Sequence, residues 1–354
     1  MRKMKKIRVV ICILIVLPIL LSLDSIAYDS NYYAKYRSPE GILFLSYTKE
    51  WDEQKLKELY GELIKNKHGQ EISLLQEVRV RGGYSDYDIR GRYQALTNTI
   101  TLYHGDSYTE PSSFRETLSH EYGHHFAYYY FKSHHFPFSK WANLRGLRNE
   151  PVRWDAFWNY SGDHHKWFPE EIIADDYVLL YGPTEKVDLK DVYSNEAFYL
   201  RTEHENQDIP NVLENKELHQ YLEKVSGLKI DKDRLLKTPI VKKVRDDTLS
   251  FSVTPKTDVA YRLNLSFYEQ QEDSYSEEGY YEMTVITSDH EGNEIVFPLE
   301  DSINEVASVP FNGYIKASVD VLDLNTSIGF QTDDFTIKVH DNHLVGTSAL
   351  NGQK

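Results

Sequence analysis

Between Pro111 and Phe131 the chain reads PSSFRETLSHEYGHHFAYYYF. Pro111 and the capping-box pattern Ser113-x-x-Glu116 are typical of a helix start, so we expect one helix that ends near Phe131. At ~100° per residue, apolar side chains recur on one face of this helix. They are Phe114, Leu118, Tyr122, Phe126 and Tyr129. The segment therefore predicts a helix that packs this face against a hydrophobic core.

Two histidines on the other side of this helix suit a metal ion. His120 and His124 are four residues apart, so both imidazoles can reach one ion. Zinc binds imidazole nitrogens at ~2.0–2.1 Å and, in catalytic sites, keeps one position for water. Glu121 follows the first histidine and can accept the proton of that water. The His-Glu-x-x-His pattern thus predicts a hydrolytic zinc centre with Glu121 as general base, whereas His125 points toward the apolar face and is interpreted as structural.

The third metal ligand must come from elsewhere, and a second predicted helix at residues 170–180 offers one. On this helix Glu171 and Asp175 are four residues apart and therefore share a face. The alternative is a solvated acidic face, because both carboxylates have acidic neighbours.

With these residues the chain resembles the gluzincins, the thermolysin-like zinc peptidases of the secreted bacterial type, over roughly residues 97–182. The resemblance implies that Glu171 binds zinc and that Asp175 accepts a hydrogen bond from the outer nitrogen of His120. It also implies a zincin-like fold. The strand predicted at residues 97–103 resembles the edge strand on which zincins pair an extended substrate.

The chain departs from the shortest gluzincins by a long gap between the two motifs, and this gap contains four histidines. They are His134, His135, His164 and His165. Each of them is an alternative metal ligand, an oxyanion donor or a surface residue. Zincins usually add a side chain that stabilises the developing oxyanion. The candidates for that role are Tyr177, Tyr181, His164 and His165.

The order of predicted elements up to about residue 236 indicates an α+β domain. Strands are expected at residues 41–47, 72–80 and 97–103, and further helices at residues 51–67 and 215–225. We expect residues 28–236 to form the zincin-like metallopeptidase domain.

The character of the chain changes at about residue 237. Short β-rich runs separated by turn residues fill the segment that follows, and no helical pattern remains. Residues 237–354 therefore predict an all-β sandwich of immunoglobulin or fibronectin-III type that serves as an accessory domain. Because it contains no identified site residue, we expect residues 28–235 alone to fold and to hydrolyse small peptides.

The first 27 residues have the features of a signal peptide or membrane anchor. A basic start precedes the apolar run Val9–Leu23, and Ser25-Ile26-Ala27 suits a signal peptidase. The sequence predicts a secreted protein or, if residues 7–23 remain as a tether, a membrane-anchored one with its catalytic domain outside. The single cysteine, Cys12, lies in this segment, which excludes disulfides and Cys-ligated zinc from the mature chain.

The net charge of the chain excludes one class of partner. The net charge of −15 argues against a nucleic-acid partner. We expect a zinc-dependent endopeptidase that binds one catalytic Zn²⁺ and acts on a peptide or protein substrate. Two alternatives remain open: a non-catalytic cell-surface adhesion protein with a zincin-like domain, and a zinc hydrolase of a non-peptide amide such as a cell-wall amide.

Overall fold

The structure is a computed structural model that describes residues 31–83, 89–156, 162–245, 248–270, 275–288, 292–299, 305–306, 311–341 and 343–348. The predicted targeting segment, residues 1–27, lies outside the described residues. Within the described ranges, no helix has the length and apolar character needed to cross a membrane.

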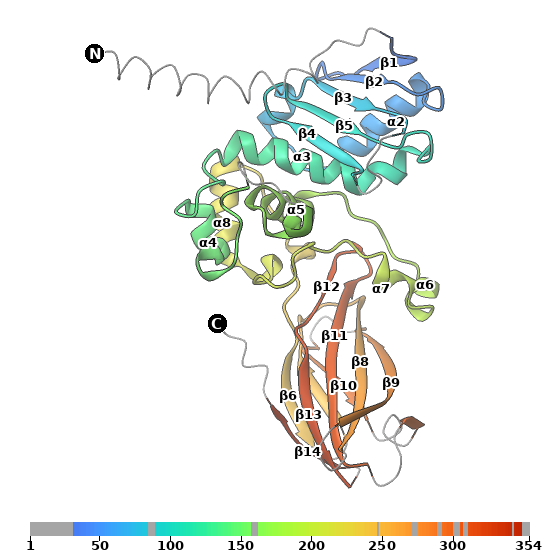
Figure 1. The fold of residues 1–354 in the computed structure, drawn as a ribbon, viewed down its shortest axis with the longest axis vertical. Helices are drawn as coiled ribbons and strands as arrows, with labels where there is room; N and C mark the ends of the chain where they lie inside the picture. Colours follow the sequence, from blue (N-terminus) through green and yellow to red (C-terminus); the bar gives the residue numbers. More distant parts are fainter. Residues whose placement is uncertain are drawn as a thin grey trace, which may run out of the picture.

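Five short strands form a mixed sheet in the N-terminal part, in the order β1-β2-β3-β5-β4 (Figure 1). They are β1 (Ala34–Arg37), β2 (Leu43–Ser46), β3 (Glu77–Val80), β4 (Gly91–Gln94) and β5 (Thr99–Leu102). The three central strands are parallel, and β1 and β4 run antiparallel to them at the two edges. Phe44, Val78 and Ile100 are aligned across the central strands and are fully buried. The centre of the sheet is thus part of the hydrophobic core.

The prediction that residues 97–103 form the edge strand is wrong. That segment is β5, which lies between β3 and β4, so β4 is the edge strand on this side of the described sheet. A turn at residues 95–98, in which Asn98 has a φ of +49°, folds β4 antiparallel onto β5. The sequence did not indicate β4 because its four residues, Gly-Arg-Tyr-Gln, include a single apolar side chain.

Helix α3 lies between the sheet and α5 (Figure 1) and contacts both β4 and β5. The α-helices are α2 (Glu53–Leu63), α3 (Arg115–Tyr130), α4 (Lys140–Arg145), α5 (Pro169–Tyr181), α6 (Leu189–Tyr193), α7 (Glu196–Tyr199) and α8 (Lys216–Ser226). Short 3₁₀ segments are η2 (Gln70–Leu74), η3 (Pro111–Phe114), η4 (Leu147–Asn149), η5 (Gly162–Trp167), η6 (Val212–Glu214) and η7 (Lys232–Arg234).

The predicted capping box does not form. Residues 111–114 make a 3₁₀ turn, and α3 begins only after Phe114, which carries no side-chain cap. The hydroxyl of Ser113 instead donates to the carbonyl of Glu110 at 2.6 Å. The 3₁₀ turn moves Ser113 out of the position from which it would cap the first turn of the helix.

The C-terminal part consists of two antiparallel sheets, with the orders β10-β7-β6 and β14-β13-β11-β8-β9, and β12 pairs with β11. The strands are β6 (Ile240–Arg245), β7 (Thr248–Ser252), β8 (Val259–Gln270), β9 (Tyr275–Ile286), β10 (Glu294–Pro298), β11 (Gly313–Asp323), β12 (Gly329–Gln331), β13 (Phe335–His340) and β14 (His343–Ser348). Phe251 of the first sheet packs on Phe335 of the second, with ring centroids 5.9 Å apart. We call these two sheets the β module.

The chain therefore combines an α+β part with a strand-rich part, in line with the expected fold class. The assignment of the β module to an immunoglobulin or fibronectin-III type stays a prediction, as does the division into residues 28–236 and 237–354.

Candidate metal centre

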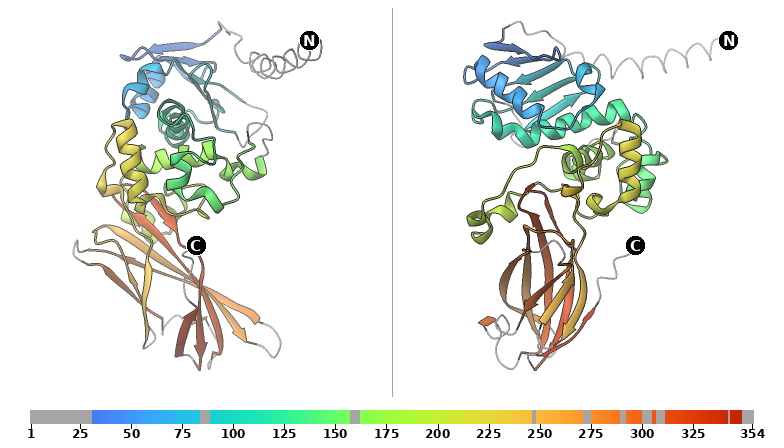
Figure 2. Two further views of the ribbon diagram at one scale, coloured as in Figure 1. Left: turned by 90° about the vertical axis from the view of Figure 1, so that its left-hand side faces the viewer. Right: turned by 180° about the vertical axis from the view of Figure 1, so that it is seen from behind.

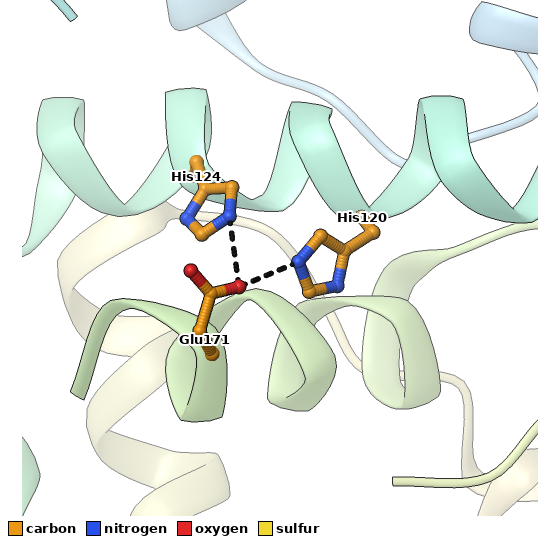
Figure 3. A group of neighbouring side chains, drawn as sticks. All are labelled: His120, His124 and Glu171. Carbon is orange, nitrogen blue, oxygen red and sulfur yellow. Dashed lines mark hydrogen bonds and ion pairs between the residues drawn. The ribbon is translucent and has the colours of Figure 1, made fainter. Parts of the chain in front are cut away.

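The residues of the predicted metal site lie on α3 and α5, which approach each other closely at Gly123. A Cβ atom on Gly123 would lie 2.8 Å from the carbonyl oxygen and 2.9 Å from the Cα atom of Ala174 on α5. Only a residue without a Cβ allows this separation of the two backbones. As a result His120 and His124, on either side of Gly123 in the sequence, both face Glu171 (Figure 3).

The donor atoms of these three residues converge on one point. The Nε2 atoms of His120 and His124 lie 2.9 Å and 3.3 Å from the same carboxylate oxygen, Oε2 of Glu171. In a tetrahedral site with metal–ligand bonds of ~2.0–2.1 Å, ligand atoms are about 3.3 Å apart. Among the described residues, this group is the one in which three donors lie within 4.8 Å of one another. His120, His124 and Glu171 can therefore hold a metal ion with little rearrangement.

Asp175 lies behind His120, as the resemblance implied. The Nδ1–H of His120 donates to Oδ1 of Asp175 at 2.8 Å, which leaves Nε2 directed at Glu171. Burial alone would lower the pKa of His120, but its hydrogen bonds to Asp175 and Glu171 outweigh burial and raise this pKa well above the ordinary value. Burial likewise opposes ionisation of Glu171, yet His124 and His120 hold the pKa of its carboxyl well below the usual range. The geometry thus favours a positive charge between these side chains, which a proton or a metal ion can supply.

Glu121 lies beside the edge strand. A Cβ atom on Gly91, the first residue of β4, would lie 2.5 Å from Oε1 of Glu121 and 2.5 Å from Cγ2 of Thr117. Glycine at this position therefore lets β4 lie directly on α3 next to the carboxylate. Burial raises the pKa of Glu121, while His124, His120 and a hydrogen bond from the Tyr93 backbone lower it.

Tyr93 of β4 connects the edge strand to the metal helix, and sequence reasoning missed it. Its ring stacks nearly parallel to that of His124, at a centroid distance of 6.4 Å. Its hydroxyl lies 3.1 Å from Nδ1 of His125, whose Nε2–H donates to the carbonyl of Glu71 at 2.8 Å. His125 is buried and ties α3 to β4 and η2, which agrees with its interpretation as a structural residue.

Of the four oxyanion candidates, His165 is next to the metal group. Its Nε2 lies 3.4 Å from Oε2 of Glu171, and its Nδ1–H donates to Oε2 of Glu205 at 2.8 Å. Its side chain is 37% exposed, so the ring lies at the solvent-accessible side of the centre. Glu205 is a second residue that sequence reasoning missed, because it belongs to no motif and lies 40 positions from His165.

The other three candidates lie elsewhere. The hydroxyl of Tyr177 donates to the carbonyl of Lys67 at 2.6 Å, and its ring packs on Tyr122 and Phe126 in the core. Tyr181 is fully buried against Phe126 as well. His164 is exposed at a kink within η5. None of them is brought to the metal group by an interaction seen in the described structure.

The other two histidines between the two motifs also lie outside the group of metal donors. His134 is buried and donates through Nδ1–H to the carbonyl of Phe131 at 2.8 Å. His135 lies 3.6 Å from Glu170. The alternative in which one of these two replaces Glu171 receives no support from the geometry.

Comparison with known proteins gives little further guidance. No family model matches the chain, and no curated protein matches it. Two crystal structures of wild-type OgpA from Akkermansia muciniphila align with it at TM-scores of 0.19 and 0.20, with 9% and 10% identity. These alignments cover 80% and 83% of this chain and 70% and 72% of OgpA. A structure of inactive OgpA with an O-glycopeptide substrate aligns at a TM-score of 0.14. Similarity at this level does not establish a shared fold.

Proposed function

We propose that this protein is a zinc-dependent peptidase. The observation that carries the proposal is the convergence of His120, His124 and Glu171 on one point, with the buried carboxylate of Glu121 on the same helix as the two histidines. Two imidazoles and one carboxylate are a ligand set of catalytic zinc sites, which leave the fourth position to water or substrate. A bound zinc ion supplies a Lewis acid and lowers the pKa of its water.

Glu121 is the general base in this proposal. It takes a proton from the attacking water and transfers it to the leaving amine. A buried carboxylate whose pKa is raised is a stronger base than an exposed one, and the hydrogen bond from the Tyr93 backbone fixes its orientation. Both features favour proton transfer at this position.

We propose that the substrate binds as an extended strand along β4. In the described sheet β4 is the edge strand next to β5, and Gly91 places this strand directly beside Glu121. Main-chain pairing of this kind is β-augmentation, which aligns a peptide without a sequence requirement. We therefore assign the role of pairing with the substrate, which was expected of residues 97–103, to β4.

We assign the oxyanion-stabilising role to His165. Its Nε2 lies at the accessible side of the metal group, and Glu205 holds the ring through the other nitrogen. Burial opposes protonation, but the hydrogen bond to Glu205 and the charge of Glu171 raise the pKa of His165, so the imidazolium form can donate from Nε2 as well. A hydrogen-bond donor fixed at such a position stabilises developing negative charge without reorganisation.

Glu121 also separates this proposal from one of its two alternatives. A non-catalytic adhesion protein gains nothing from a carboxylate buried beside a metal group, because burial of an ionisable side chain costs free energy. A zinc hydrolase that cleaves a non-peptide amide would use the same residues, so the substrate has to be tested directly.

The N-terminal segment, which lies outside the described residues, motivates a proposal on location. We propose export through residues 1–27, with cleavage after Ala27 or retention of a tether at residues 7–23. N-terminal sequencing of the exported protein distinguishes the two. A full-length chain found only in the cytosol would contradict both.

The proposed function is tested by metal analysis together with hydrolysis of a degenerate peptide library. We expect about one zinc per chain and hydrolysis that a chelator abolishes. Glu121→Gln should keep the zinc and lose activity by at least ~10²–10⁴-fold, because the ligands remain and the base is gone. His120→Ala should lose both zinc and activity. Near-normal turnover by E121Q would show that the mechanism is wrong.

The ligand set is tested by zinc affinity, measured in competition with a chromogenic chelator. Glu171→Ala should weaken zinc binding most, and Asp175→Ala by ~10–100-fold, as is typical of a group that orients a ligand. His165→Ala should leave the affinity near that of the wild type. A site that loses zinc in H165A and retains it in E171A would require three histidine ligands instead.

A further inference from the structure

We propose that Glu205 is a positioning residue of the metal centre and that the β module holds it in place through the segment Arg201–Asp208. We call this segment the strap. The inference rests on the proposed function, since it concerns the geometry of the same zinc site. It gives the β module a part in forming the metal centre, in place of the accessory role expected from the sequence.

At the metal end of the strap, one residue supports two groups of the site. The backbone N–H of Glu205 donates to Oδ2 of Asp175 at 2.8 Å, and its side-chain Oε2 accepts from His165 at 2.8 Å. Asp175 in turn holds His120 through its other oxygen. Glu205 therefore fixes both the carboxylate behind a metal ligand and the histidine beside the metal group.

The residues around Glu205 are fixed as well. Asn206, which is 1% exposed, donates from its side chain to the carbonyl of Lys166 at 2.9 Å. Asp208 forms an ion pair with the ammonium group of Lys166 at 2.8 Å. Buried His204 accepts a hydrogen bond from the backbone of Asn206 at 2.9 Å. The strap thus holds the segment that carries His165 by backbone and side-chain contacts.

At its other end the strap is attached to the β module. Thr202 forms a parallel bridge with Ile328, through hydrogen bonds to the backbones of Ser327 (2.8 Å) and Gly329 (3.0 Å). A second attachment to the β module lies beyond Glu205, where the side chain of Gln207 accepts from the backbone N–H of Gln331 at 3.0 Å. Figures 1 and 2 show β12 at the end of the module that is nearest α5.

A buried ion pair reinforces this attachment. The guanidinium of Arg201 donates to Oδ1 of Asp320 on β11 at 2.9 Å and to the carbonyl of Phe198 at 2.7 Å. The Arg201 and Asp320 side chains are 7% and 2% exposed, so solvent does not screen the interaction. Arg201 contacts no residue of the metal group in any interaction of the described structure, which makes it a suitable position from which to test the strap.

Hydrogen-bond partners behind metal ligands typically contribute ~10–100-fold to metal affinity, because they fix ring orientation and ligand basicity. An amide N–H orients Asp175 only while its own backbone is held. Thr202 and Gln207 fix the strap on the β module, and Asp208 fixes it on Lys166. Loosening the end at Arg201 should therefore allow Asp175 and His165 to reorient.

The test is made on the full-length mature protein with Arg201→Met and Glu205→Ala. Zinc affinity is measured by chelator competition, and the visible absorption of the Co²⁺-substituted protein reports coordination geometry. We expect R201M to weaken zinc binding about tenfold, which is within the range typical of groups that orient a ligand, and to change the Co²⁺ spectrum. Glu205→Ala keeps the backbone N–H on Asp175 and loses only the carboxylate that holds His165, so it should change the spectrum while zinc affinity stays near that of the wild type, as in H165A. Arg201→Lys, which keeps a cation near Asp320, should recover part of the affinity.

Ile337→Val is the matched control. Ile337 is fully buried in β13 and pairs with Ile315 and Thr347, so the variant should destabilise the β module at a position that pairs with no residue of the strap. We expect its thermal midpoint to fall while zinc affinity and the Co²⁺ spectrum stay as in the wild type. If R201M lowers the thermal midpoint but leaves zinc affinity and spectrum unchanged, the strap has no positioning role. If the wild type itself binds no zinc, the proposed function fails, which is a separate outcome.

Discussion

His134 is a buried histidine in which one ring nitrogen forms a hydrogen bond and the other does not. Its Nδ1–H donates to the carbonyl of Phe131, and its Nε2 has no hydrogen-bond partner in the described structure. Burial, together with the neighbouring His135, lowers the pKa of His134 to about 3. The folded protein therefore keeps this ring neutral at a pH where the unfolded chain, with a pKa of 6.5, takes up a proton. The contribution of His134 to stability is complete above pH 6.5 and is lost as the pH falls toward 3.

This pKa shift predicts an acid-sensitive stability that a single substitution removes. At a pH of about 5 the linkage corresponds to a loss of about 2 kcal/mol in the free energy of unfolding. His134→Asn keeps a donor for the Phe131 carbonyl and cannot titrate. Urea unfolding of chelator-treated wild type and H134N, at about pH 7.5 and 5, measures the difference. Equal losses in both proteins would mean that His134 is not the group that couples protonation to unfolding.

At the scale of single residues, the sequence predicted the side chains that belong to spaced motifs. His120, His124, Glu171 and Asp175 could be identified because spacing on a helix determines which side chains share a face. Glu205 could not, because its role depends on a backbone N–H and on where a loop passes. The contact of its carboxylate with His165 likewise depends on the path of the loop, which no spacing in the sequence indicates.

At the scale of the elements, the contact between α3 and α5 determines the separation of the ligands. Gly123 allows the two backbones to touch at Ala174, and the ligands on either side of this contact meet at Glu171. Adding a methyl group here forces the helices apart, and such overpacking typically costs ~1–3 kcal/mol. The position is therefore both a packing contact and a determinant of the metal geometry.

Gly123→Ala should accordingly lower both the thermal midpoint and the zinc affinity. Gly61 in α2 provides the control, because a Cβ on Gly61 would meet no atom within 4 Å. Alanine is the better helix former by ~1 kcal/mol, so G61A should maintain or raise stability and leave zinc affinity unchanged. Thermal unfolding and chelator competition on both variants make the comparison. Wild-type zinc affinity in G123A would show that the helix spacing does not control the site.

Elements were predictable where they are long and have clear start or stop residues. The metal helix and α5 were predicted to within two residues at most boundaries, because Pro111 and Pro169 mark their starts and Gly182-Pro183 marks the end of α5. The edge strand β4 was missed, since four residues cannot show a period of two clearly. Its position depends on the turn at residues 95–98 and on the fit of Gly91 against Glu121, which are tertiary features.

At the scale of the whole molecule, apolar contacts cross the boundary predicted near residue 236. Val192, Ala197 and Phe198, from α6 and α7, form a hydrophobic cluster with residues of the β module. Their partners are Ala260, Leu322 and Leu324. Helices α6 and α7 thus precede the predicted boundary in sequence but pack on the module beyond it. The sequence could not show this, because both helices are short and their apolar residues have no periodic pattern.

This packing changes the expectation for residues 28–235 on their own. The fragment retains the five-stranded sheet with α3 and α5, a core large enough for one domain. It loses the surface that buries Phe198 and the strands that hold the strap. We therefore predict that the fragment folds around α3 and α5, that residues 187–208 lose protection from hydrogen exchange, and that zinc affinity falls at least as far as in R201M. Hydrogen exchange with mass spectrometry and chelator competition measure the two effects on the same sample. A fragment with a protected strap and full zinc affinity would instead support the independent catalytic domain expected from the sequence, because the metal centre would then need nothing from the β module.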